Sequence, residues 1–211
     1  MGYVGTCVPV DKDWTPYDLN HTLSVLDTAA VFYSRSRSGC IDSLREEGIE
    51  PAALWYNPNI HPWKEYQARR DCLLAYAPTI GMEVRVLEDY GLRDFCRHVA
   101  ADIDRRCAYC YAHRLEGTAK YAADHGFAAF TTTLLSSLYQ DHEGIVRAAE
   151  AYARRYGVAF LYRDFRPNFR AGNQRARELG FYMQKYCGCV FSEEDRYEKQ
   201  IRRDRERFME P

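Results

Sequence analysis

Short apolar runs alternate with segments of helical periodicity through most of this chain. The apolar runs are predicted strands: "AALWYNP" (52–58), "MEVRVL" (82–87), "FAAFTTTLL" (127–135) and "VAFLY" (158–162). Helices are predicted before and between them: one ending at Gly48, one over 61–77, one from about Leu92, one over 107–124 and one over 142–157. This alternation predicts an α/β fold in a single domain, with a mostly parallel sheet flanked by helices on both faces (Rossmann-like).

The length of 211 residues suits one α/β domain better than two. No long Ser, Gly or Pro tract marks a linker. We expect an N-terminal extension over 1–22, the α/β domain over 23–197 and a charged C-terminal tail over 198–211. The tail contains "RRDRERFME", which we interpret as a solvated helix end.

Charge and hydropathy say more about where the protein is located than about which molecule it binds. Lys and Arg number 29 against 30 Asp and Glu, so no overall positive field indicates nucleic acid, although a local basic patch is compatible with this balance. The first residues lack the basic start and apolar core of a signal peptide, and no run of 18 apolar residues occurs. We therefore expect a soluble cytoplasmic protein with no membrane partner.

Polar loops follow three of the predicted strands directly. They are "YNPNIHP" (56–62), "TTTLLSSLYQDHE" (131–143) and "YRDFRPNFR" (162–170). In an open parallel sheet, the binding site lies beyond the carboxyl ends of the strands. We therefore predict that these three loops converge at one edge of the sheet and share a site.

Eight cysteines are present, and without a secretion signal we expect them to be reduced, buried, metal-bound or redox-active. Two pairs are set apart by their spacing: CxxC at 107–110 and CxC at 187–189. The other cysteines stand alone. A solitary cysteine such as Cys72 or Cys96 usually serves as a small apolar residue.

The CxxC pair lies where a helix is predicted to begin, so Cys107 and Cys110 would share a face of its first turn. A helix N-terminus lowers the pKa of a thiol, and Arg105 and Arg106 add positive charge, so we expect thiolates there. The motif alone is compatible with a redox disulfide, half of a zinc site or half of an iron–sulfur site.

In the CxC pair, only Gly188 separates Cys187 from Cys189, and its missing Cβ permits a tight backbone. Two thiols at this spacing can close into a strained disulfide or point at one metal. Together with the CxxC pair they would supply the four thiolates of a zinc site or a cluster.

Longer motifs surround these cysteines: "LWYNPNIHPWKEYQARR", "RCAYCYAHRLEGTA", "HGFAAFTTTLLSSLYQDHE" and "FLYRDFRPNFRAGNQRARELGFYMQKYCGCVFSEEDRY". Together, from about Cys40 to Tyr197, they resemble the epoxyqueuosine reductase QueH family. The resemblance implies an oxidoreductase that removes the epoxide oxygen of epoxyqueuosine at the wobble position of tRNA, giving queuosine. It also implies an iron–sulfur cluster without cobalamin and an electron donor that remains unidentified.

By the same resemblance, Cys107 and Cys110 match ligands of a [4Fe–4S] cluster. Cys187 and Cys189 match a redox-active, catalytic pair, which alternatively holds an additional iron beside the cluster. The CGC motif would then be part of the reducing centre.

One segment departs from the family pattern. A Cys-Cys-x-x-Cys loop is expected before the helix that ends at Gly48, but this chain has "SVLDTAAVFYSRSRSGC" there, with only Cys40 nearby. Two thiolates do not complete the usual ligation of a [4Fe–4S] cluster, so either the CGC cysteines are recruited or the cluster is absent. Residues 24–39 reflect either divergence or, as a hypothesis, a local frame error over Asp27–Val31.

Further residues are candidates for supporting roles. Three could act as acids: Asp164, His61 and Tyr139. Five could meet tRNA phosphates: Arg163, Arg166, Arg170, Arg69 and Arg70. Three could stack on a base, although the first is expected in the core: Trp55, Tyr56 and Trp63. Two other interpretations remain at this point, a zinc-stapled binding module without catalysis and a thiol oxidoreductase.

Overall fold

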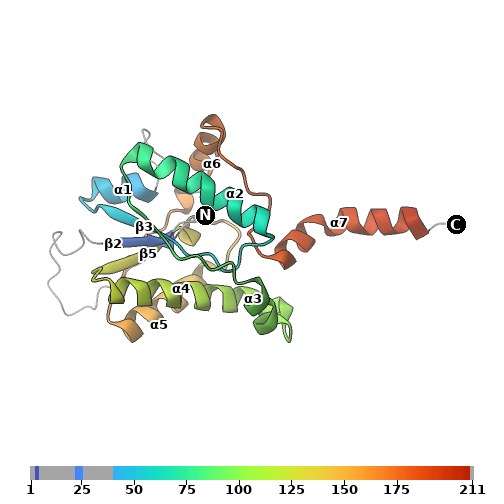
Figure 1. Ribbon diagram of the computed structural model, residues 1–211, viewed down its shortest axis with the longest axis horizontal. Helices are drawn as coiled ribbons and strands as arrows, with labels where there is room; N and C mark the ends of the chain where they lie inside the picture. Colours follow the sequence, from blue (N-terminus) through green and yellow to red (C-terminus); the bar gives the residue numbers. More distant parts are fainter. Residues whose placement is uncertain (1–2, 5–21, 26–39, 210–211) are drawn as a thin grey trace.

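The computed structural model describes residues 3–4, 22–25 and 40–209 (Figure 1). Most of the predicted N-terminal extension and residues 26–39 lie outside this part of the chain. The family pattern places its cysteine loop in this segment, so the loop lies outside the described residues. The choice between divergence and a frame error lies outside them as well.

The strands form a mostly parallel sheet, as predicted. Strand β2 (Thr22–Val25) pairs in parallel with β5 (Ala129–Thr132), and β5 pairs in parallel with β6 (Ala159–Phe160). The short β1 (Tyr3–Val4) pairs antiparallel with β2 and β5. A second parallel pair, β3 (Pro51–Trp55) with β4 (Val84–Val86), runs beside β2 (Figure 1).

Helices cover both sides of these strands (Figure 1). Helices α1 (Cys40–Glu46) and α2 (Trp63–Tyr76) lie on one side, and α4 (Arg106–Asp124) and α5 (His142–Tyr156) pack together on the other. Helix α3 (Leu92–Val99) precedes α4, and α6 (Phe169–Glu178) follows β6. The predicted α/β class is confirmed, with α6 as a helix that the sequence analysis did not anticipate.

The central strands are buried on both faces because helices cover both faces (Figure 1). All five residues of β3 are buried, and so are all four of β5. Trp55 at the end of β3 is fully buried and donates a hydrogen bond from Nε1 to the hydroxyl of Tyr66, 2.8 Å away. The expected core position of Trp55 is thus confirmed, and the end of β3 is fixed against α2.

Helix α7 (Val190–Met209) begins directly after the CGC motif and projects away from the rest of the molecule (Figure 1). None of its side chains is buried. The predicted solvated helix end is confirmed and belongs to a helix of 20 residues. Among the described residues, no helix is long and apolar enough to cross a membrane.

Candidate active site

The first turn of α4 places its polar and sulfur side chains on one face. The side chain of Asp102 accepts a hydrogen bond from the backbone N–H of Arg105 and so fixes the turn that leads into the helix. From there Cys107, Cys110, Tyr111 and Arg114 follow at the three- and four-residue spacing that keeps side chains on one helix face.

The CGC motif turns sharply at Gly188, which has a φ of 138°. A Cβ at this position would lie 3.1 Å from Cγ1 of Ile60 and 3.4 Å from Nη1 of Arg69. Both the backbone angle and the close approach therefore favour glycine, as the sequence predicted. The turn allows the side chains of Cys187 and Cys189 to reach one cavity.

The loop that follows β3 holds the CGC turn by its backbone. The N–H of His61 donates to the carbonyl oxygen of Gly188 at 2.7 Å, and the hydroxyl of Tyr186 donates to the carbonyl oxygen of His61 at 2.6 Å. His61 is fully buried, with its ring packed near Tyr90 and Phe95. It therefore positions the CGC turn instead of facing a ligand.

Arg69 of α2 holds the same turn through its side chain. Its guanidinium donates to the carbonyl oxygens of Tyr186 and Cys187, each at 3.1 Å, and to the carboxylate of Glu65 at 2.6 and 2.8 Å. The hydroxyl of Tyr182 donates to the other oxygen of Glu65. Arg69 is fully buried, so the prediction that it meets tRNA phosphates is wrong.

Both cysteine pairs line a single small cavity. Its walls include all four of Cys107, Cys110, Cys187 and Cys189, together with Tyr111 and Gln140. The solitary cysteines Cys72 and Cys96 do not line this cavity: Cys72 is half-buried on α2, and Cys96 packs against the small apolar cluster that contains Phe95, Val99 and Cys189. The structure thus brings together the four cysteines that the spacing selected.

The thiols of α4 do not favour the thiolate form, contrary to the expectation from the helix N-terminus. Burial raises the pKa of Cys110 to about 12. Burial also raises the pKa of Cys107, and the nearby guanidinium of Arg106 only partly opposes this effect. Loss of hydration outweighs the positive charge at this helix end, because the charged form of a thiol is the one that burial penalises.

The thiolate lies instead in the CGC pair. A hydrogen bond from the Cys187 thiol lowers the pKa of Cys189 to about 7, and the hydroxyl and N–H of Ser192 lower it further. The same hydrogen bond raises the pKa of Cys187 well above its ordinary value. Cys189 immediately precedes α7, so its sulfur also benefits from the helix N-terminus. One thiolate and one thiol are therefore held side by side.

Four cysteines in two pairs are the donor set that binds iron–sulfur clusters, and three of them, Cys107, Cys110 and Cys187, would have to lose a proton on binding. Among the described residues, no group of three or more His, Cys, Asp or Glu is arranged to hold a single metal ion. The space between the thiols is about 20 Å³, room for about one water molecule, so a larger group would require the side chains to turn outward.

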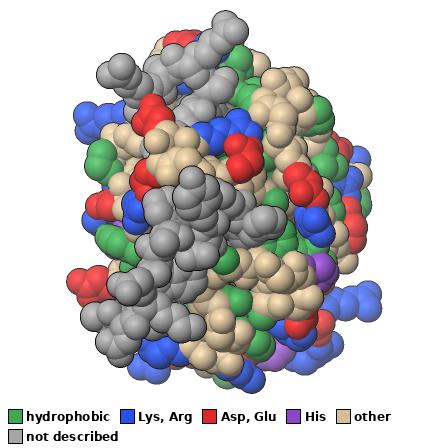
Figure 2. Space-filling model, turned by 90° about the vertical axis from the view of Figure 1, so that its left-hand side faces the viewer, with side chains coloured by type: hydrophobic (Ala, Val, Ile, Leu, Met, Phe, Trp, Pro, Cys, Tyr) green, Lys and Arg blue, Asp and Glu red, His purple; other side chains and the backbone are tan. Residues whose placement is uncertain are grey.

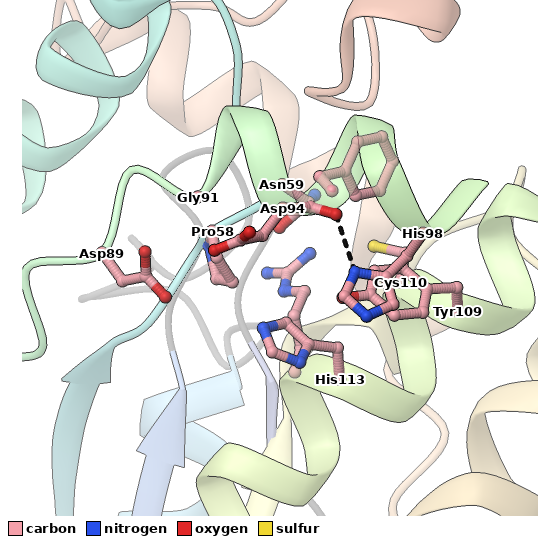
Figure 3. A pocket seen from close by; sticks show the side chains of 11 residues that line it. Pro58, Asn59, Asp89, Gly91, Asp94, His98, Tyr109, Cys110 and His113 are labelled. Atoms are coloured by element: carbon pink, nitrogen blue, oxygen red, sulfur yellow. Dashed lines mark hydrogen bonds between the residues drawn. The ribbon is translucent and has the colours of Figure 1, made fainter. Parts of the chain in front are cut away.

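A second pocket of about 150 Å³ opens beside the thiol cavity (Figure 3). The two share Asn59, Phe95, Cys110 and Arg114 as lining residues. The sulfur of Cys110 therefore connects the pocket to the cysteine cluster. The pocket also contains the carboxylates of Asp89 and Asp94.

One wall of this pocket is a stack of rings. Tyr109 lies between His98 and His113, with ring centroids 4.7 and 5.5 Å apart and interplanar angles of 13° and 9°. The hydroxyl of Tyr56 hydrogen-bonds Nε2 of His113 at 3.2 Å, and burial lowers the pKa of His113, which favours its neutral form. An aromatic wall with the carboxylate of Asp89 nearby suits a planar ligand that carries positive charge, whereas Asp94 already pairs with Arg97.

The other residues singled out from the sequence lie elsewhere. Asp164 pairs with Arg166 at 2.6 Å, and Tyr139 is 83% exposed, so neither lines the thiol cavity or the pocket. Trp63 stacks on Tyr66 outside both spaces.

Most of the arginines assigned to phosphates already have carboxylate partners. Arg163 pairs with Glu47 at 2.5 Å, and Arg70 pairs with Glu88 at 2.8 Å. Within the part of the chain that the structure describes, Arg170 is the member of that set without an ion pair. The predicted basic surface is therefore largely neutralised.

The convergence of the three polar loops holds in part. Asn59 from the first loop and Gln140 from the second line the thiol cavity, where Gln140 accepts a hydrogen bond from Tyr111 at 2.8 Å. The third loop meets the second through His142 and Tyr162, 3.1 Å apart, but lines neither cavity.

Several lining residues escaped the sequence analysis: Tyr111, Arg114, His98, His113, Asp89 and Asp94. For Tyr111 and Arg114 a signal exists, because they continue the face of α4 that carries Cys107 and Cys110. Asp89 and Asp94 reach the pocket from the β4–α3 segment, which no motif connected with the cysteines.

The chain matches the family model of epoxyqueuosine reductase QueH over residues 35–195. It is 38% identical over 155 residues to a Dehalococcoides mccartyi protein named epoxyqueuosine reductase QueH, covering 74% of this chain and 85% of that protein. Proteins of the same name from Thermotoga maritima and Haemophilus influenzae are 35% and 34% identical over 164 residues. Those matches cover 73% and 74% of this chain, and 85% and 66% of the two proteins. The matched region contains both cysteine pairs.

Proposed function

Because the chain belongs to the epoxyqueuosine reductase QueH family, we propose that it reduces epoxyqueuosine at the wobble position of tRNA to queuosine. The observation that carries this proposal is the meeting of the two cysteine pairs in one cavity beside a ring-lined pocket. The pocket gives a place for a nucleotide turned out of its stack, and the thiols give a reducing centre next to it.

The reaction sets a clear requirement for electrons and protons. Both carbon–oxygen bonds of the epoxide break, a carbon–carbon double bond forms, and the oxygen leaves as water after taking up two electrons and two protons. Oxidation of the Cys189 thiolate and the Cys187 thiol to a disulfide releases two electrons and one proton, so the pair balances this reaction when water supplies the second proton. The unidentified electron donor must then reduce the disulfide for another cycle.

Cys107 and Cys110 are the residues that we propose as ligands of a [4Fe–4S] cluster. When bound, such a cluster would supply electrons one at a time at low potential. The remaining ligands would come from the CGC pair or from the N-terminal segment, and an additional iron beside the cluster is the alternative role of Cys187 and Cys189.

The surrounding residues have positioning roles in this proposal. The stack of His98, Tyr109 and His113 offers ring edges, or the outer face of a histidine, to the modified base, and Asp89 can pair with a positively charged part of its side group. The thiol of Cys187 holds a proton next to the Cys189 sulfur. Phe95, shared by both cavities, limits access of water.

Among the two alternatives, exchange with protein disulfides is disfavoured by the 4% exposure of Cys189, since an attacking thiolate must reach its target. The test of the proposed function is turnover. The chain is purified without oxygen, supplied with iron, sulfide and a chemical reductant, and incubated with tRNA that carries epoxyqueuosine. Queuosine in the digested tRNA supports the proposal, whereas a protein with stoichiometric zinc, no iron and no product would indicate the zinc-stapled module.

A further inference from the structure

Helix α7 extends the molecule outward from the thiol cavity. It starts at Val190, next to Cys189 of the cavity, and runs into solvent (Figure 1). The family match ends at residue 195, so most of the helix lies beyond it. The role of this outer part therefore has to be argued from its own side chains.

Four cations lie on one face of this outer part. Arg196, Lys199, Arg203 and Arg207 are separated by three, four and four residues, which is the spacing of a single helix face. All four are exposed. With a rise of about 1.5 Å per residue, they form a stripe about 16 Å long, which we call the basic stripe.

The basic stripe is not neutralised by carboxylates. Within the described residues, no ion pair joins any of its four members to an acidic side chain, whereas Arg202 on another face pairs with Glu198 at 3.1 Å. The contacts of the stripe are internal to the helix: Nε of Arg203 donates to the carbonyl oxygen of Lys199, and Arg207 lies over the ring of Phe208. Its charges are therefore available to a ligand.

Several arginines of the body, in contrast, are paired with carboxylates. Arg45, Arg70, Arg85, Arg155 and Arg163 each pair with a glutamate. On the face shown in Figure 2, blue and red side chains are interspersed and do not gather into one basic patch. The basic stripe thus differs from the paired arginines of the body.

We propose that the basic stripe of α7 binds the phosphate backbone of the tRNA while its wobble nucleotide occupies the pocket. The identity of the RNA rests on the proposed function. A row of exposed cations on a helix matches a row of phosphates, and such contacts orient a nucleic acid without reading its sequence. Because α7 begins at the thiol cavity, the stripe holds the stem next to the nucleotide that reacts.

The test compares two double variants of the full chain. Arg196→Gln with Arg203→Gln removes two charges from the stripe, and Arg202→Gln with Arg205→Gln removes two charges from other faces of the same helix. Affinity for tRNA without epoxyqueuosine is measured by fluorescence anisotropy at several salt concentrations. This probe keeps the result independent of turnover, since backbone contacts do not require the modified base.

For the stripe variant we expect a loss of about tenfold in tRNA affinity at low salt. The slope of log affinity against log salt concentration should become shallower by about one to two. For the control variant we expect less than about a twofold change. With tRNA that carries epoxyqueuosine, the stripe variant should raise KM and leave kcat unchanged. Equal losses in both variants, no loss in either, or a stripe variant that changes only self-association of the protein would each overturn the proposal.

Discussion

The buried guanidinium of Arg69 donates hydrogen bonds both to a carboxylate and to the carbonyl oxygens of the CGC turn. Few other side chains could fill this position. Lysine keeps the charge but cannot provide the forked set of donors. We expect Arg69→Lys to lower the free energy of unfolding by about 2 to 4 kcal/mol and to reduce turnover further than this loss explains.

Urea unfolding and the rate of queuosine formation measure the two effects of Arg69→Lys. Arg70→Lys is the matched control, since Arg70 is the next residue of α2 and pairs with Glu88 near the surface. If both variants are equally active and equally stable, Arg69 does not position the CGC turn.

His61 predicts a pH dependence of stability. Burial lowers its pKa to about 4, while the ordinary value is 6.5, so the folded protein binds a proton less readily than the unfolded chain. The neutral ring, which donates from Nε2 to the carbonyl oxygen of Pro58, is the form that the fold accepts. Its contribution is present in full above pH 6.5 and is lost as the pH falls towards 4, by about 3 kcal/mol in total.

This contribution is measured as the free energy of unfolding in urea at a series of pH values. His61→Gln should flatten the curve between pH 6.5 and 4, and His125→Gln, which changes an exposed ring, should leave its shape unaltered. A His61→Gln curve parallel to that of the unmodified chain would show that another group carries the dependence.

At the scale of elements, α4 and the CGC turn present two cysteine pairs with different surroundings. Cys107→Ala or Cys110→Ala should lower iron per chain after anaerobic reconstitution, because each removes a proposed ligand and no third thiol on α4 can replace it. Cys187→Ser and Cys189→Ser should keep most of the iron and abolish turnover, since the pair is proposed to supply the electrons that reduce the epoxide.

Cys72→Ala provides the control for iron content, because Cys72 is half-buried on α2 and lines neither cavity. Iron loss of the same size in Cys72→Ala would show that the spacing argument selected the wrong cysteines. Complete loss of iron in Cys187→Ser and Cys189→Ser would instead make the CGC pair a ligand pair.

The elements themselves were largely predictable, and the reason is local. Strand β3 is a short apolar run, β5 begins in the apolar run 127–130, and α5 ends at Gly157 in the left-handed conformation that glycine favours. Cysteine spacing likewise selected the cavity. The pKa values of Cys107 and Cys110 and the pairing of Arg69 and Arg163 were not predictable, since they depend on contacts between segments far apart in the sequence.

At the scale of the whole molecule, the apolar core and the additional cluster ligands expected from the family pattern lie in different parts of the chain. The two larger apolar clusters of the described residues run from Ile41 to Phe181. The ligands that the family pattern adds would stand within residues 24–39 instead. A change of ligation in that segment should therefore alter iron binding and leave the stability of the core nearly unchanged.

Thr28→Cys, Ala29→Cys and Phe32→Cys together restore the Cys-Cys-x-x-Cys spacing. We expect this triple variant to raise iron per chain and queuosine formation together, because the added thiolates complete the coordination that Cys107 and Cys110 begin. The matched variant with serine at the same three positions should raise neither, and without iron both should keep the unfolding midpoint of the iron-free unmodified chain. Full iron content and full turnover in the unmodified chain would contradict this expectation and would assign the missing ligands to Cys187 and Cys189 or to Cys40.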